Sequence, residues 1–240
     1  MFDRGRVRPS DGCIETLMAQ NYGALTVIAL AAILLFSGCG RESEVNTEME
    51  GLYIALQPFG EVPDEVLEFL RGELPKRLFG IRVRKIKPPP IPKDAYDPSR
   101  GQYLSGPFLG SLQLPEGAVK ALGVVDEDLY APGLNFIFGQ ASLNGIGGII
   151  ALVRLRPEFW GERTGDPKAL FFLRALKEAV HELSHSFGLR HCPDPSCVMH
   201  FSNTIWDTDR KGADFCGRCR SILGARMRDI IAKYKMRNAN

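Results

Sequence analysis

The residues of this 240-residue chain best suited to chemistry lie in the segment 181–191, HELSHSFGLRH, whose spacing is HExxHxxGxxH. It holds three of the chain's four histidines. Three imidazoles bind one Zn²⁺ and leave its fourth position open, with a carboxylate beside it. We therefore predict His181, His185 and His191 as ligands of a catalytic zinc. Glu182 is the predicted general base, taking a proton from zinc-activated water that attacks a peptide carbonyl.

A helix over residues 167–187 is predicted to position these groups. Asp166 is a suitable N-cap, and Pro167 suits the first helical position. Because His181 and His185 are four residues apart, their rings project from one side of that helix. Gly188 then permits a left-handed cap, so that the chain can bring His191 back to the metal. The predicted apolar stripe consists of Ala169, Phe172, Leu173, Leu176, Val180, Leu183 and Phe187.

Four cysteines follow the last histidine in a C-x4-C and a C-x2-C pair, Cys192, Cys197, Cys216 and Cys219. This spacing predicts a closed tetrahedral structural zinc site, with two disulfides as the alternative. Because His191 and Cys192 are consecutive, a filled four-cysteine site would hold the loop that carries His191. Met199 fits a tight turn beneath the histidines or an ordinary core position. His200 is not predicted as a ligand.

The remaining sequence predicts a single domain over residues 51–240. Hydrophobic patterning favours strands at 52–56, 80–86, 123–125, 134–139 and 148–155 and helices at 64–74 and 221–235. The closing helix is expected to bury Ile222, Leu223, Met227, Ile230 and Ile231. Five prolines within residues 87–98 predict an extended surface loop.

The N-terminal segment is expected to direct export. Residues 23–38 are almost wholly apolar but short for a membrane span, which fits a signal peptide better. The segment ends in LFSGC, which resembles a lipoprotein processing site and predicts an acylated Cys39; an uncleaved anchor and a start at Met18 are alternatives. Residues 1–38 are therefore interpreted as a signal peptide or anchor and residues 39–50 as a flexible tether. The expected location is exported and membrane-anchored, with a cytoplasmic location as the alternative.

Charge indicates no special partner, because the formal net charge is only +2. Lysines and arginines gather near residues 82–87 and 218–235, which we interpret as solvated faces. A nucleic-acid-binding zinc module is disfavoured, because the first cysteine pair is C-x4-C and no aromatic stacking set surrounds it. The chain is expected to act as a monomer.

Together these motifs resemble the archaemetzincin family within the metzincin clan. The resemblance rests on HExxHxxGxxH followed directly by cysteine, on the CVM of residues 197–199, on the FCGRC of residues 215–219, and on upstream segments such as RGQY at residues 100–103. It implies an α+β fold with a twisted mixed sheet over an active-site helix and a C-terminal helix after a Met-turn at Met199. It also implies two zinc ions, one catalytic and one structural, and a peptide or protein substrate. A non-catalytic zinc-containing protein that binds a peptide or partner is the alternative function.

Overall fold

A five-stranded mixed sheet forms the centre of the structure, a computed structural model that describes residues 51–238. Its strand order is β2-β1-β5-β8-β7. The first four strands in this order are parallel, and β7 runs antiparallel to β8 at the edge. The strand bounds are β1 Tyr53–Phe59, β2 Arg82–Lys85, β5 Ala118–Val125, β7 Gly139–Ala141 and β8 Gly147–Ala151.

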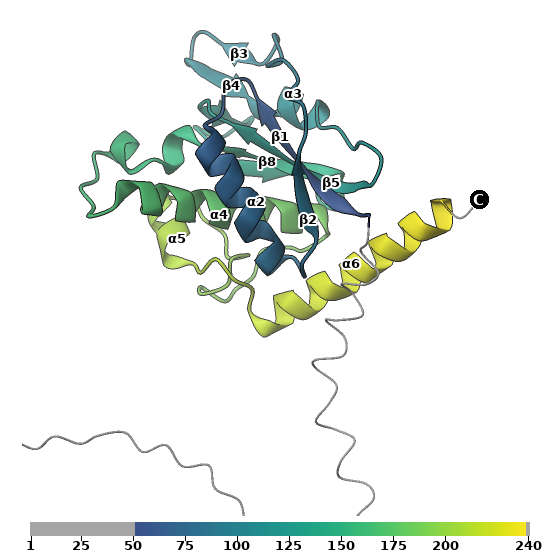
Figure 1. Cartoon of the computed structure of the whole chain (residues 1–240). Helices are drawn as coiled ribbons and strands as arrows, with labels where there is room; N and C mark the ends of the chain where they lie inside the picture. The colour runs from purple at the N-terminus through teal and green to yellow at the C-terminus, as the bar shows by residue number, and fades with distance from the viewer. Residues whose placement is uncertain (1–50, 239–240) are drawn as a thin grey trace, which may run out of the picture. The chain divides into compact units, whose positions relative to one another are not determined.

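Helices and a small second sheet surround these strands, and Figure 1 shows α2 and α4 packed together below the sheet, with α6 crossing the lower edge. The α-helices are α2 Asp64–Arg77, α3 Ser105–Gly110, α4 Pro167–Ser186, α5 Ile205–Arg210 and α6 Gly217–Asn238. Two 3₁₀ turns, η1 Val153–Leu155 and η2 Pro157–Trp160, precede α4. The second sheet has the order β3-β4-β6, with β3 at Tyr96–Asp97, β4 at Gln102–Leu104 and β6 at Leu129–Tyr130.

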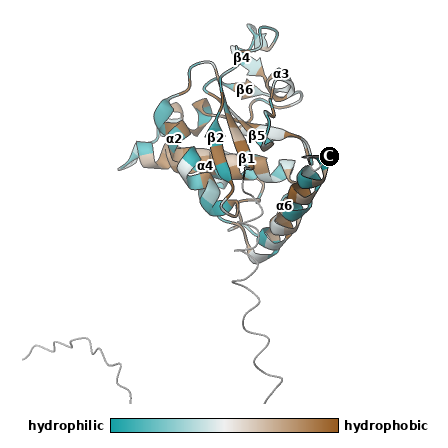
Figure 2. Cartoon of the chain, turned by 45° about the vertical axis from the view of Figure 1, so that its right-hand side comes forward, coloured by the Kyte–Doolittle hydropathy of each residue, from teal (hydrophilic) through white to brown (hydrophobic). Residues whose placement is uncertain are grey.

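The central sheet is covered on both faces. Alternate residues of its strands enter two separate apolar clusters, as Ile54 and Ala55 of β1 illustrate. The larger cluster joins the sheet to α2, α4 and α6, and the smaller one lies on the α3 side with Phe108. Figure 2 accordingly shows hydrophobic strands inside and hydrophilic stretches on the outer surfaces of the helices. Burial on both faces explains why β1, β5 and β8 are largely apolar, with Gln57 of β1 and Lys120 of β5 as buried polar exceptions.

The predicted active-site helix is confirmed. Asp166 caps it through a hydrogen bond from the backbone N–H of Ala169 at 2.9 Å, and Pro167 occupies its first turn. The predicted apolar stripe is wrong at Ala169, which is exposed, and at Leu173, which is 40% exposed, whereas Arg174 is buried. The reason is tertiary: the segment around α5 covers the polar face of α4 and leaves part of the apolar stripe at the surface.

The strand predicted at 134–139 is wrong, because regular pairing begins only at Gly139. Backbone amides of this segment make isolated hydrogen bonds instead; for example, the N–H of Ile137 donates to the carbonyl of Leu129. The strand predicted at 148–155 ends at Ala151 and continues as η1. Periodicity alone does not distinguish an apolar segment with isolated bonds from a strand in a ladder.

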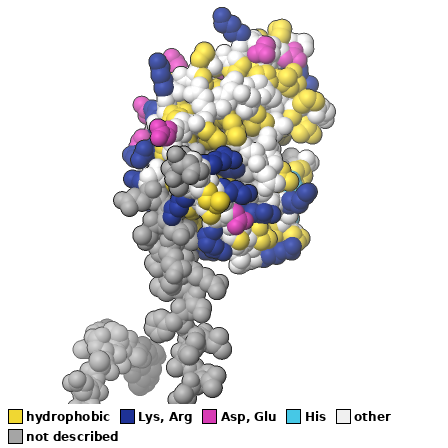
Figure 3. Space-filling view, turned by 90° about the vertical axis from the view of Figure 1, so that its right-hand side faces the viewer, with side chains coloured by type: hydrophobic (Ala, Val, Ile, Leu, Met, Phe, Trp, Pro, Cys, Tyr) yellow, Lys and Arg dark blue, Asp and Glu magenta, His cyan; other side chains and the backbone are white. Residues whose placement is uncertain are grey.

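The other elements are confirmed with shifted ends. Helix α2 continues beyond residue 74 and contains Pro75 in its last turn, and the strand predicted at 123–125 begins already at Ala118. Helix α6 is longer than the predicted 221–235, and it leaves Ile222 38% exposed, contrary to the prediction. Figure 3 shows lysine and arginine side chains over the lower part of the molecule, where α6 lies.

The predicted signal peptide or anchor, the tether and Cys39 lie outside the described residues. Within residues 51–238, no helix combines the length and the hydropathy that crossing a membrane would need.

Candidate active site

The three predicted histidines converge at the C-terminal half of α4 and in the loop that follows. Their ligating nitrogens lie within 4.8 Å of one another. The Nδ1 atoms of His181 and His185 lie 2.8 Å from the carbonyl of Val198 and 2.7 Å from that of Leu189. A carbonyl only accepts, so each Nδ1 carries the proton and each Nε2 presents a lone pair. Those two Nε2 atoms are 3.0 Å apart, a separation that one shared metal ion explains.

The protonation states favour metal binding as well. Burial lowers the pKa of His181 well below its ordinary value, and it also lowers the pKa of His185 and His191. All three imidazoles are therefore neutral near pH 7, as ligation requires. The donor set, three neutral nitrogens with outer hydrogen bonds that fix two of the rings, fits zinc with an open position.

Gly188 turns the chain from α4 toward His191. Its φ is +95°, in the left-handed region, and its N–H bonds the carbonyl of His185. The next residue, Leu189, returns its N–H to the carbonyl of Ser184 and its own carbonyl to the ring of His185. A Cβ at position 188 would lie only 2.2 Å from Oδ1 of Asn144.

Replacing Gly188 by alanine is therefore expected to lower both stability and zinc affinity. The positive φ and the collision with Asn144 together cost about 1–3 kcal/mol, and His191 shifts with the displaced turn. Chemical denaturation and competition with a zinc chelator measure the two effects. Gly165→Ala is the matched control, since Gly165 is exposed and a Cβ there meets nothing within 4 Å. Unchanged stability and zinc affinity in Gly188→Ala would contradict this account.

Glu182 lies beside the histidine cluster and is almost fully buried. Burial raises the pKa of this carboxyl well above its ordinary value, and the negative charge of Glu178 raises it further. Two strand glycines make room for the side chain. A Cβ at Gly139 would lie 2.6 Å from Cγ of Glu182, and one at Gly148 would lie 2.9 Å from its Cβ. Sequence analysis gave these glycines no functional role, and only the packing of α4 against β7 and β8 identifies them.

We expect Gly139→Ala to reduce turnover strongly while the histidine cluster keeps its metal. The new Cβ pushes against Glu182 and against the carbonyl of Ile149 at 2.8 Å, so the carboxylate moves away from its position. Misplacing a general base by about 1 Å can cost on the order of 10²-fold in rate. Peptide turnover and zinc content check this, with Gly106→Ala, whose Cβ meets nothing, as the control. Full turnover in Gly139→Ala would contradict this prediction, because it would show that the added Cβ does not displace the Glu182 carboxylate.

The four cysteines also come together, with their sulfurs within 4.8 Å of one another. The Sγ atoms of Cys192 and Cys216 are 3.8 Å apart, and all four residues are free thiols. The alternative of two disulfides is therefore not realised. The backbone N–H of Cys216 points at Sγ of Cys197 at 3.4 Å, which supports thiolate character there. Four sulfurs at these separations fit a tetrahedral zinc ion.

A tight turn around Met199 connects the two clusters. Cys197 belongs to the sulfur cluster, and the next carbonyl, that of Val198, holds the ring of His181. The carbonyl of Met199 accepts the N–H of Cys192 at 2.8 Å, and its side chain is fully buried. His200 stays outside the histidine cluster, and its Nδ1 bonds the carbonyl of Cys192. The carbonyl that orients His181 therefore directly follows Cys197 of the sulfur cluster, and the carbonyl of Met199 holds Cys192, which directly follows His191.

A pocket of about 270 Å³ opens beside the histidines and Glu182. Edge strand β7 contributes Gly139 and Ala141 to one wall. Aromatic side chains form much of the remaining wall, and Glu178 and Lys211 also line the pocket. The outer edge of β7 has no strand partner within residues 51–238. A concave site with converging polar groups beside such an edge is suited to an extended peptide.

Comparison with known proteins agrees with this geometry. The model of peptidase family M54 matches residues 115–224. The chain is 48% identical over 181 residues to the archaemetzincin of Pyrococcus furiosus, a match spanning 72% of this chain and 93% of the relative. The chain belongs to the archaemetzincin family. It is therefore a zinc-dependent metallopeptidase, as the resemblance implied.

Solved archaemetzincin structures share the fold. The one from Methanopyrus kandleri superimposes with a TM-score of 0.64 at 36% identity, covering 74% of this chain and 97% of that one. A zinc-dependent peptidase from Methanocorpusculum labreanum gives a TM-score of 0.62 at 30% identity, covering 71% and 99%. The expected α+β archaemetzincin fold, with its mixed sheet and C-terminal helix, is thereby confirmed.

Proposed function

We propose that each chain holds two zinc ions, a catalytic one on His181, His185 and His191 and a structural one on Cys192, Cys197, Cys216 and Cys219. The observation that carries this proposal is the convergence of two Nε2 lone pairs, 3.0 Å apart, next to a buried carboxylate in an open pocket. When bound, the catalytic zinc polarises the substrate carbonyl and lowers the pKa of its water to roughly 7. The other groups are supplied by the chain itself.

Glu182 acts as general base and then as general acid. Its carboxylate takes a proton from the water molecule that attacks the peptide carbonyl, and it then gives that proton to the leaving amine. A raised pKa suits this exchange, because it brings proton uptake and proton release closer to neutral pH. The carbonyls of Val198 and Leu189 keep the rings of His181 and His185 in one orientation throughout.

Strand β7 supplies a binding edge for the substrate. Within the described residues it pairs only with β8, so its other edge can take an extended peptide backbone as an added strand. Such pairing places a peptide bond beside the histidines without selecting its side chains. Whether cleavage is internal or removes a terminal residue then depends on how the pocket receives the two ends of the peptide.

The test combines metal analysis with cleavage profiling. The full chain is purified without chelator, its zinc content per chain is measured, and it is incubated with a broad peptide library before and after chelation. We expect about two zinc ions per chain and cleavage that chelation removes and zinc restores. Two zinc ions with no cleavage anywhere in the library would favour the alternative, a protein that binds peptides without cutting them.

We also propose export and membrane attachment through an acylated Cys39, with a monomeric domain outside the bilayer. The support is the apolar run at residues 23–38 ending directly before cysteine. Mass spectrometry of the N-terminal peptide from membrane fractions is expected to find Cys39 as the first residue with acyl chains attached. An intact N-terminus in the soluble fraction would support the cytoplasmic alternative instead.

A further inference from the structure

Lys211 places a buried ammonium group at the wall of the active-site pocket. Its side chain is 0% exposed, and its Nζ lies 2.9 Å from Oε1 of Glu178. Despite this ion pair, Nζ makes no aligned hydrogen bond within residues 51–238. The same pocket is lined by Ser202, whose buried Oγ also has no hydrogen-bond partner in that range. Two polar groups able to donate therefore line one pocket: Lys211 Nζ, whose single close carboxylate leaves N–H donors unused, and Ser202 Oγ, which has no acceptor within residues 51–238.

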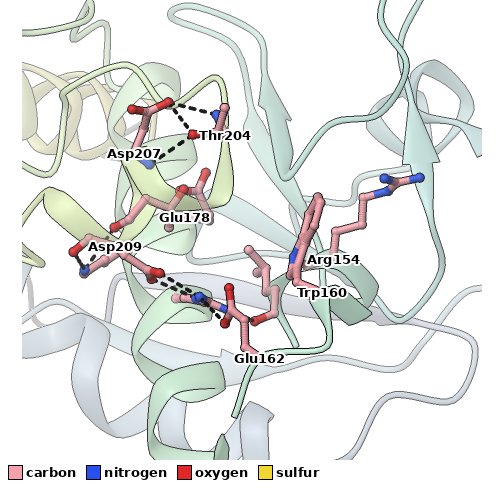
Figure 4. A network of polar contacts seen from close by, with 11 residues as sticks. Arg154, Trp160, Glu162, Glu178, Thr204, Asp207 and Asp209 are labelled. Atoms are coloured by element: carbon pink, nitrogen blue, oxygen red, sulfur yellow. Dashed lines mark hydrogen bonds and ion pairs between the residues drawn. The ribbon is translucent and has the colours of Figure 1, made fainter. Parts of the chain in front are cut away.

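Lys211 neutralises the buried Glu178, but it is not needed to anchor its own segment to α4. The segment that carries it is already fixed to α4 by other groups, because the Arg174 guanidinium binds the carboxylates of Asp209 and Glu162. Lys177 adds bonds from its Nζ to the carbonyls of Thr208 and Asp209. Figure 4 shows this network, with Glu162 and Asp209 meeting at the same partner and Glu178 close by. Anchoring α5 to α4 thus needs no ammonium at position 211.

The surroundings of the two groups indicate what they would bind. Phe136, Phe138 and Phe201 also line the pocket, so a side chain inside it would contact apolar rings as well as Lys211 and Ser202. Buried donors without acceptors are costly, so a ligand that supplies an acceptor is favoured over an aliphatic ligand of the same shape. Glu178 already offsets the charge of Lys211, so a neutral oxygen acceptor fits here as well as an anionic one.

We infer that this pocket selects a substrate side chain that ends in a carbonyl oxygen, either a carboxamide or a carboxylate. Lys211 Nζ and Ser202 Oγ donate to that oxygen, while the phenylalanine rings pack on the methylene groups behind it. The inference rests on the proposed function, since it concerns the substrate of the same site. Lys211 and Ser202 are specificity residues in this scheme, and Glu182 alone carries the proton.

Peptide series with matched shapes test the inference. One decapeptide sequence is prepared with Gln, Glu, Met or Leu placed at each position around the cleaved bond in turn. At the position that enters the pocket, the full-length zinc-loaded chain is expected to cleave the Gln or Glu peptide about tenfold or more faster than the Met peptide, measured as kcat/KM. A higher rate for Glu than for Gln identifies a carboxylate as the preferred group, and equal rates identify the shared carbonyl.

Variants separate recognition from folding. Lys211→Met is expected to bring the Gln-to-Met ratio to about one, and Ser202→Ala to lower it several-fold. Lys211→Met alone leaves Glu178 buried without a cation, so the double variant with Glu178→Gln is made alongside it. Lys233→Met on the exposed side of α6 is the matched control and keeps the wild-type ratio. Thermal unfolding of each variant shows which of them are folded.

Binding measurements keep this inference distinct from catalysis. The same peptides are titrated into zinc-loaded Glu182→Gln, and their dissociation constants should follow the same order. If the Gln or Glu peptides bind more tightly than the Met peptide but the wild type cleaves none of them, the proposed function is refuted and the assignment of the pocket stands. Equal binding and equal cleavage of Gln and Met peptides at every position, or a ratio unchanged in folded Lys211→Met/Glu178→Gln and Ser202→Ala, would overturn the inference.

Discussion

Glu182→Gln is expected to lose peptide cleavage by about 10²–10⁴-fold in kcat while it keeps zinc on the histidine cluster. Glutamine fills the same space between Gly139 and Gly148, so the packing of α4 on the sheet is preserved. It carries no carboxylate, so neither proton uptake nor proton release is available at this position. The rings of His181 and His185 keep their hydrogen bonds to the carbonyls of Val198 and Leu189, which do not involve Glu182.

The fold of this variant should also survive removal of the metal. Burial raises the pKa of Glu182 in the folded chain and so destabilises the ionised carboxylate. The folded chain therefore loses stability as pH rises from the ordinary pKa of a glutamate toward the raised pKa of Glu182. A neutral amide removes the cost, so at pH 7 the metal-free variant should unfold at the same temperature as the wild type or higher. Kinetics, zinc content and calorimetry measure these three properties. Glu68→Gln on the surface is the control, and full turnover in Glu182→Gln would refute the general-base role.

Cys219→Ser is expected to remove the structural zinc and to weaken the catalytic site, although it changes none of the three histidines. Structural zinc sites contribute about 10–16 kcal/mol of apparent binding free energy at neutral pH, so loss of one thiolate lowers the unfolding temperature strongly. The effect reaches the histidines through the turn at residues 197–200. Its carbonyls hold the ring of His181 and the N–H of Cys192, the neighbour of His191.

The coupling is measured by titrating catalytic zinc in the variant against a chelator. Displacing outer contacts of metal ligands typically costs 10–100-fold in metal affinity, and we expect a loss of about that size. Ser221→Ala, two residues away on the exposed side of α6, should leave both sites unchanged. If Cys219→Ser lost one zinc ion but kept the wild-type affinity for the other, together with full activity, the two clusters would be independent.

The sequence predicted which residues come together as two clusters of candidate metal ligands, because their spacing is local. Two histidines four residues apart on one helix must share a face, and a glycine three residues after the second allows the chain to reverse. Neither statement needs the rest of the fold. The cysteine pairs follow the same logic, since each pair spans one short turn. The strand prediction for residues 134–139 was wrong because an apolar run forms a strand only where a neighbouring strand supplies regular hydrogen-bond partners.

The buried charges of α4 were beyond local reasoning. Arg174 and Glu178 lie outside the apolar stripe predicted for this helix, on a face that is normally turned to water. In the fold they are covered by the segment 204–211 and paired with Asp209 and Lys211, more than thirty residues later in the chain. Nothing in the composition of that segment indicates that its lysine is fully enclosed. The pairing exists only because α5 packs across α4.

By itself the amino-acid order determined which side chains can hold metal and which carboxylate accompanies them, because ligand spacing and helical periodicity act over a few residues. Tertiary structure alone decided the room that Gly139 and Gly148 leave for Glu182, the link between the two clusters and the lining of the pocket by Lys211 and Ser202. These features join segments that are distant along the chain. Their contacts depend on packing and desolvation, which become defined only when the sheet, α4 and the C-terminal segments are assembled.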